Sequence, residues 1–177
     1  MVVVILNCFH WSGYHCARHL LHRGHEVVGV DEINHPKKEE LYMYVGRNSH
    51  FQHFNTIEER ENHSHSSRED PQIFVSDENF ILFQEKASVQ EIKIEVPPLY
   101  GEWMEMEDKQ IETIDDLKFW IMENNAVYIE DFLDPVMEHF EQGNLSDIKD
   151  VTFQRSQEAD QPSELLERIW LIHTMNR

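Results

Sequence analysis

The stretch SGYHCARHLLHRGHEVVGVD, residues 12–31, decides the fold of this chain. It opens with Gly13, its apolar residues recur on one helical face, and Gly24 stands where a helix typically ends. A short apolar run follows and finishes at Asp31. Because the β-branched run VVVIL at residues 2–6 precedes this stretch, the pattern predicts a buried strand, a helix and a second strand.

The loop between the first strand and the helix departs from the usual nucleotide-binding pattern. A strand–helix–strand unit is typical of a Rossmann fold, in which the first loop carries a G-x-G-x-x-G fingerprint. The corresponding residues read NCFHWSG, with bulky side chains where small ones are expected. We therefore predict the α/β class: a compact Rossmann-like parallel sheet flanked by helices, with an altered phosphate-binding loop.

Length and composition fit a single domain. A chain of 177 residues is long enough to bury a core without disulfides or structural metal. A hydrophobic content of 40% with 11% aromatic residues argues against global disorder. We expect residues 1–96 to form a nucleotide-binding-like core and residues 97–177 to form a small acidic α+β portion of the same domain.

The net charge of −19 is concentrated in the second half of the chain. Residues 1–50 contain five acidic residues and five Lys or Arg, whereas residues 100–150 contain fifteen acidic residues and three Lys. Such a surface repels phosphate groups, which argues against nucleic acid and anionic membranes as partners. The acidic half serves either solubility or the docking of a basic protein partner.

Cysteine usage and the N-terminus indicate a cytoplasmic protein. The two cysteines, Cys8 and Cys16, form no C-x-x-C pair, so neither a disulfide framework nor a zinc knuckle is indicated. The opening MVVVIL lacks a basic segment and a cleavage site, and we interpret it as a buried strand. No run approaches the roughly 18 apolar residues that a membrane span requires.

The remaining pattern predicts further elements along the chain. Residues 2–6, 26–30 and 73–75 are expected to be parallel strands, with the helix of residues 13–23 packed against them. The other predicted elements are helices at 37–46, 114–125, 132–143 and 162–175, strands at 50–57, 72–77, 89–96, 126–131 and 148–154, and a polar surface loop at 58–71.

Several of these pieces resemble the extended short-chain dehydrogenases, the NAD-dependent epimerase/dehydratase family that acts on nucleotide sugars. Residues 12–31 resemble that family's first helix and second strand. Further similar segments follow in the family's order: RNSHFQHF, QIFVSD, IKIEVPPLYGEW and NAVYIEDFLDPVMEHFEQG. Family members are far longer, so the resemblance implies deletions on both sides of QIFVSD, where the family has its fourth strand and its catalytic helix.

The resemblance assigns roles to the residues of the first loop. In the family, one glycine makes the tight turn, a second lets the backbone approach the pyrophosphate, and a third permits close helix packing. These positions hold Asn7, His10 and Gly13. Asn7 tolerates left-handed backbone geometry, and Gly13 is kept. His10 projects where the pyrophosphate is expected, so we predict either no cofactor or weakly bound NAD.

Asp31 stands where the family holds the adenosine ribose, which would select NAD over NADP. Its other interpretation is an ordinary aspartate at a strand end. Helix amides after Ser12 would still favour an anion. The candidate cofactor-binding residues are therefore Asn7, His10, Ser12, Gly13 and Asp31.

The family's catalytic pair is missing from this chain. Its chemistry uses a tyrosine as acid or base, with a lysine four residues later that lowers the tyrosine pKa. The residues four after the five tyrosines are Arg18, Gly46, Asn48, Met104 and Phe132. Tyr14 with Arg18 imitates the pair but lies on the first helix. Ser76 resembles the end of the strand that supports the family's catalytic serine, and we favour a capping or turn role for it.

Histidines are concentrated in the first third of the chain, with ten of the twelve in residues 10–65. Imidazole and thiolate groups suit zinc, but no H-E-x-x-H spacing occurs. We favour solvated or capping histidines over a metal site.

Two functions remain open at this point. The preferred hypothesis is a non-catalytic, epimerase/dehydratase-like protein that binds a nucleotide, a nucleotide sugar or a protein partner. The alternative is an NAD-dependent oxidoreductase or nucleotide-sugar epimerase with rearranged catalytic residues. The absent Tyr-x-x-x-Lys pair and the altered loop favour the first, and the frame from Gly13 to Asp31 favours the second.

Overall fold

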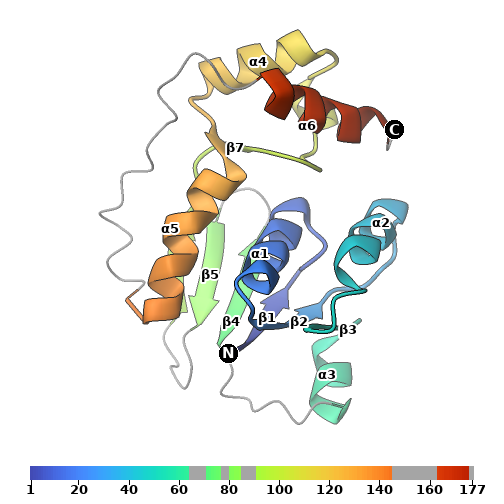
Figure 1. Ribbon diagram of the computed structural model, residues 1–177, viewed down its shortest axis with the longest axis vertical. Coiled ribbons are helices and arrows are strands. Elements are labelled where there is room, and N and C mark those ends of the chain that lie inside the picture. Colours follow the sequence, from blue (N-terminus) through green and yellow to red (C-terminus); the bar gives the residue numbers. More distant parts are fainter. Residues whose placement is uncertain (64–70, 77–79, 85–90, 145–162, 176–177) are drawn as a thin grey trace.

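The computed structural model describes residues 1–63, 71–76, 80–84, 91–144 and 163–175, which adopt an α/β fold (Figure 1). The main sheet has the strand order β3-β2-β1-β4-β5-β6, and a second sheet pairs β7 with β8. The strands are β1 (Val2–Leu6), β2 (Glu26–Val30), β3 (Phe51–Phe54), β4 (Gln72–Ser76), β5 (Phe80–Gln84), β6 (Glu91–Glu95), β7 (Leu99–Tyr100) and β8 (Val127–Tyr128). The predicted Rossmann-like class is confirmed.

Three helices cover one face of the sheet, Ile57 of α3 packs with Val4 and Val28 on the other face, and two helices lie beyond one end. They are α1 (Trp11–His22), α2 (Pro36–Val45), α3 (Ile57–His63), α4 (Ile114–Glu123), α5 (Ile129–Gln142) and α6 (Ser163–Met175), with a 3-10 turn at Glu107–Lys109. In Figure 1, α1, α2 and α5 lie side by side in front of the sheet, and α1 packs against both α2 and α5. Helices α4 and α6 pack together beyond the carboxyl end of β1.

The first half of the sheet is parallel, as the sequence predicts. β1 lies between β2 and β4, with Val3 opposite Val27 and Ile5 opposite Ile73. The central residues of β1 are completely buried because both faces of the strand are covered. The strand order reverses beside β1, and in open α/β sheets ligands bind at the carboxyl ends of the strands at such a point.

The second half of the sheet is antiparallel, which the sequence did not reveal. β5 pairs antiparallel with both β4 and β6. Only three residues separate β4 from β5 and six separate β5 from β6. A parallel neighbour needs a crossover of about a dozen residues or more, so these connections permit only hairpins. The short run of residues 80–84 was missed because it lies between polar residues.

Two predicted elements need correction, and a third lies outside the described residues. The predicted loop at 58–71 begins with α3, because the Thr56 hydroxyl accepts from the Glu59 amide at 3.2 Å while the Glu59 carboxylate accepts from the Asn55 amide at 2.8 Å. This is close to a capping box, which the polar composition hides. The predicted strand at 126–131 ends at Tyr128, where α5 begins. The predicted strand at 148–154 lies outside the described residues.

Candidate functional site

Asn7 makes the tight turn that ends β1. Its φ is 60°, the left-handed conformation expected from the sequence. Its amide donates to the Val30 carbonyl at 2.9 Å, and its side-chain Nδ2 donates to the Val75 carbonyl at 3.0 Å. Asn7 therefore ties the end of β1 to both neighbouring strands, which a glycine at this position would not do.

Gly13 allows α1 to pack directly on this turn. A Cβ atom at this residue would lie 2.4 Å from the Asn7 carbonyl oxygen and 3.1 Å from the Cys8 Cα. Because both neighbours are backbone atoms, neither can move without displacing the loop. The packing role assigned to Gly13 from the sequence agrees with this geometry.

His10 and Ser12 lie at the N-terminus of α1. His10 is the N-cap residue, and its Nδ1 lies 2.7 Å from the Ser12 hydroxyl. In Rossmann domains the pyrophosphate binds at this helix end. The His10 side chain therefore forms a local contact at the position where the sequence predicted interference with phosphate.

Phe9 fills the space between this loop, α2 and β3. Its side chain is 3% exposed. Its ring centroid lies 5.9 Å from that of Tyr42, 6.3 Å from that of Phe51 and 5.2 Å from that of His53. Aromatic clusters of this kind add packing energy beyond their buried area. Phe9 therefore packs the first loop against α2 and β3.

Both carboxylate oxygens of Asp31 are engaged by the chain itself. Oδ2 accepts from the Phe9 amide at 2.9 Å, and Oδ1 forms an ion pair with the Lys38 ammonium at 2.6 Å. The Asp31 side chain is only 8% exposed. Asp31, which the family resemblance assigns to ribose binding, thus holds the β1–α1 loop to α2.

Tyr100 and Tyr128, on strands β7 and β8, are held by contacts within the chain. Tyr100 is completely buried, and its ring centroid lies 5.6 Å from that of the tilted Tyr128 ring. The Tyr128 hydroxyl donates to Glu102 at 3.1 Å and accepts from Arg168 at 3.3 Å. Burial and the adjacent Glu102 charge hold the pKa of Tyr128 well above its ordinary value. Burial likewise raises the pKa of Tyr14.

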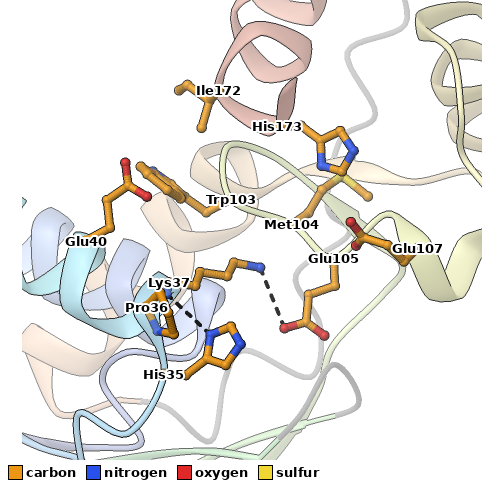
Figure 2. A pocket seen from close by; sticks show the side chains of 10 residues that line it. All are labelled: His35, Pro36, Lys37, Glu40, Trp103, Met104, Glu105, Glu107, Ile172 and His173. Carbon is orange, nitrogen blue, oxygen red and sulfur yellow. Dashed lines mark hydrogen bonds and ion pairs between the residues drawn. The ribbon is translucent and has the colours of Figure 1, made fainter. Parts of the chain in front are cut away.

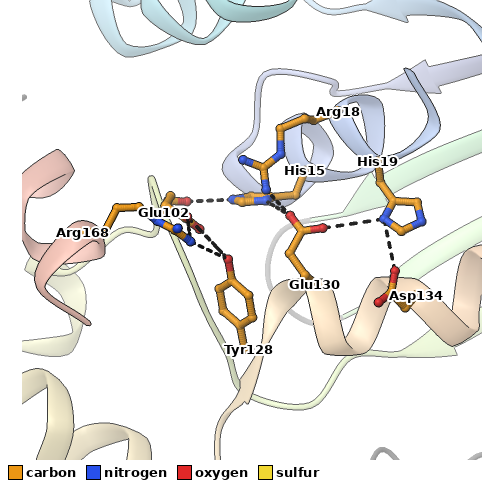
Figure 3. A network of polar contacts seen from close by, with 8 residues as sticks. All are labelled: His15, Arg18, His19, Glu102, Tyr128, Glu130, Asp134 and Arg168. Atoms are coloured by element: carbon orange, nitrogen blue, oxygen red, sulfur yellow. Dashed lines mark hydrogen bonds and ion pairs between the residues drawn. The ribbon is translucent and has the colours of Figure 1, made fainter. Parts of the chain in front are cut away.

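A partly buried polar network that the sequence analysis missed joins α1 to α5 (Figure 3). His15 is completely buried, with Nδ1 2.9 Å from a Glu130 oxygen and Nε2 3.0 Å from the Glu102 carbonyl. The Arg18 guanidinium donates to the same Glu130 carboxylate. His15 thus lies between a carboxylate of α5 and the backbone of the segment after β7, and its ring joins both to α1.

Glu130 is the centre of this network. Burial of its carboxyl works to raise the pKa, but hydrogen bonds from His15 and His19 and the positive charge of Arg18 hold that pKa well below its ordinary value. His19 Nδ1 lies 3.6 Å from Glu130 and 3.7 Å from Asp134. Two histidines four residues apart on α1 face two acids four residues apart on α5, a spacing that could have signalled the contact.

The cysteines and histidines form no metal centre in the part of the chain that the structure describes. Within those residues, no group of three or more His, Cys, Asp or Glu side chains is placed to hold a metal ion. Cys8 and Cys16 are buried and unpaired. Burial raises the pKa of Cys16 to about 12 and that of Cys8 well above its ordinary value, which disfavours the thiolate, the reactive form of the side chain.

The chain has a Rossmann-like α/β fold. Asp31, the acidic residue after β2, is bonded to Phe9 and Lys38 of the same chain. No protein-family profile, curated protein or solved structure matches the chain. The resemblance to the epimerase/dehydratase family therefore stays a prediction. Across the described residues, every helix is too short or too polar to span a membrane.

Proposed function

We propose that the chain is a non-catalytic binding protein and that it does not hold NAD in the usual Rossmann manner. The observation that supports this proposal is the internal bonding of Asp31. In a dinucleotide-binding domain this carboxylate accepts from the ribose hydroxyl. A ribose here has to compete with the Phe9 amide and the Lys38 ammonium for a carboxylate that is only 8% exposed, and a hydrogen bond to a charged group is worth about 1.5–3 kcal/mol.

The settings of Tyr128 and Tyr100, neither of which suits a catalytic acid or base, support the proposed lack of catalysis. An effective catalytic group has a pKa near the working pH. Tyr128 departs from that requirement because its pKa is raised and its hydroxyl is bonded to Glu102 and Arg168. Tyr100 is completely buried and offers no surface to a substrate.

A protein partner is favoured by the outer face of α4. Phe119 and Met122 are 65% and 70% exposed there. The acidic residues Asp115 and Glu123 lie on the same helix, and the Asp115 side chain is 87% exposed. An apolar pair flanked by acids suits a basic amphipathic segment of a partner. We expect Phe119→Ser with Met122→Ser to abolish docking of a lysine- and leucine-rich helical peptide, whereas Met43→Ser leaves it unchanged.

Calorimetric titration of the full chain with NAD, NADP and UDP-sugars tests the main proposal. We expect no saturable binding of NAD by the wild type and no hydride transfer or epimerisation. His10→Gly with Lys38→Ala frees the helix end and one Asp31 oxygen, and should give measurable NAD affinity. Lys37→Ala with His10→Gly is the matched control, because Lys37 pairs with Glu105 instead.

The alternative oxidoreductase makes the opposite predictions. Tight NAD binding by the wild type, together with turnover that is lost in Tyr128→Phe, would establish a substitute acid or base and contradict the proposal.

A further inference from the structure

A hollow of about 350 Å³ lies between α2, residues 103–107 and α6, on a different set of residues from Asp31 (Figure 2). Its walls combine apolar side chains with carboxylates, and Lys37, His35 and His173 also line it. The residues that matter for the argument are Trp103, Met104, Ile172, Glu40, Glu105 and Glu107. A concave site with aromatic walls and a few polar groups is the usual form of a small-molecule site.

The charges lining this cleft favour a cation. Lys37 Nζ lies 3.6 Å from Glu105, so the lysine and one of the glutamates offset each other. Glu40 is half-buried, and within the described part of the chain its carboxylate has no hydrogen-bond or ion-pair partner. A half-buried carboxylate without a partner is stabilised by any cation that reaches it.

Trp103 adds an unusual aromatic wall. Its φ is 71°, a conformation that bulky side chains rarely adopt, and such strain persists only where the surroundings hold the residue in place. The Trp103 ring lies 5.5 Å from the ring of Tyr44, which is one helical turn after Glu40 on α2. Figure 2 shows Glu40 and the Trp103 ring at one end of the cleft, away from the Lys37–Glu105 pair.

We propose that this cleft binds a compact organic cation. The ammonium group lies between the Glu40 carboxylate and the face of Trp103, and the apolar part lies against Met104 and Ile172. Aromatic faces attract weakly hydrated ammonium groups. A hard metal ion is disfavoured because it requires several oxygen ligands, and among the described residues no three His, Cys, Asp or Glu side chains are placed to hold a metal ion. The inference rests on the proposed function only in that the chain acts by binding.

Calorimetry with choline and its neutral isostere 3,3-dimethylbutan-1-ol tests this assignment on the full chain. The two molecules share shape and differ in charge. We expect choline to bind about tenfold more tightly than the alcohol and to lose about fivefold or more in Glu40→Gln. Glu39→Gln is the matched control, because this exposed neighbour removes the same charge from the same helix without lining the cleft.

Each other outcome overturns the assignment. Undetectable choline binding at millimolar concentration, equal affinity for the two probes, or equal losses in Glu40→Gln and Glu39→Gln would each show that the cleft does not recognise a cation. Thermal melting of both variants separates a loss of fold from a loss of site. A NAD titration of the same preparation reports on Asp31, so a negative choline result leaves the proposed function standing.

Discussion

Replacing Asp31 by alanine distinguishes a structural carboxylate from one kept for a ligand. The change removes the acceptor of the Phe9 amide at 2.9 Å and the partner of Lys38 at 2.6 Å, from a side chain that is 8% exposed. Hydrogen bonds to charged groups contribute about 1.5–3 kcal/mol each. Because the Lys38 side chain is 25% exposed and regains water, the ion pair contributes less than that. We expect a total loss of about 2–3 kcal/mol.

Differential scanning fluorimetry and urea unfolding measure this loss. For a chain of this size a loss of 1 kcal/mol lowers Tm by roughly 2–4 °C, so Asp31→Ala should melt about 4–12 °C below the wild type. Asp31→Asn keeps an acceptor for Phe9 and should lie between the two. Glu32→Ala is the control, since it is the exposed neighbour. An Asp31→Ala variant as stable as the wild type would refute the reasoning and return Asp31 to the role of ligand contact.

Three further experiments probe the first loop, the network around Glu130 and the two thiols. Gly13→Ala forces Cβ against the Asn7 carbonyl and should cost about 1–3 kcal/mol in urea unfolding, whereas an unchanged midpoint would mean that the loop yields freely. Because the folded-state pKa of Glu130 is lowered, its stabilisation is complete above the ordinary carboxyl pKa of about 4.3 and is lost as pH falls. The stability gap between wild type and Glu130→Gln should therefore shrink as pH falls below about 5, and a constant gap would contradict the network. Cys8 and Cys16 should resist a thiol reagent until the chain is unfolded, and rapid labelling of the native chain would contradict their burial.

The parallel half of the fold was predictable because its signals are local. The β-branched run of β1, the helix that follows Gly13 and the strand ending at Asp31 each carry the periodicity of a buried element. The backbone roles of Asn7 and Gly13 were also predictable, since few residue types fit a left-handed turn or a close helix contact. The conformation at all these positions is determined by residues close to them in the sequence.

The antiparallel half and the internal bonding of the site depend on contacts between distant residues. β5 has no periodicity to distinguish it, and only the short connections on both sides require hairpins. Phe9 was recognised as bulky, but its burial depends on rings from α2 and β3. Lys38 reaches Asp31 across seven residues, and Glu130 meets His15 across 115, so neither pairing is visible in a local pattern.

An NMR titration of the labelled chain with NAD tests the internal bonding of Asp31 most directly. The backbone amides of Phe9 and Gly13 report on the carboxylate and on the helix end where a dinucleotide would bind. If Asp31 is held by Phe9 and Lys38, both amide signals should stay in place up to millimolar NAD. Saturable shifts of both signals at micromolar NAD would show that the cofactor displaces these contacts, and would contradict the proposed non-catalytic binding protein.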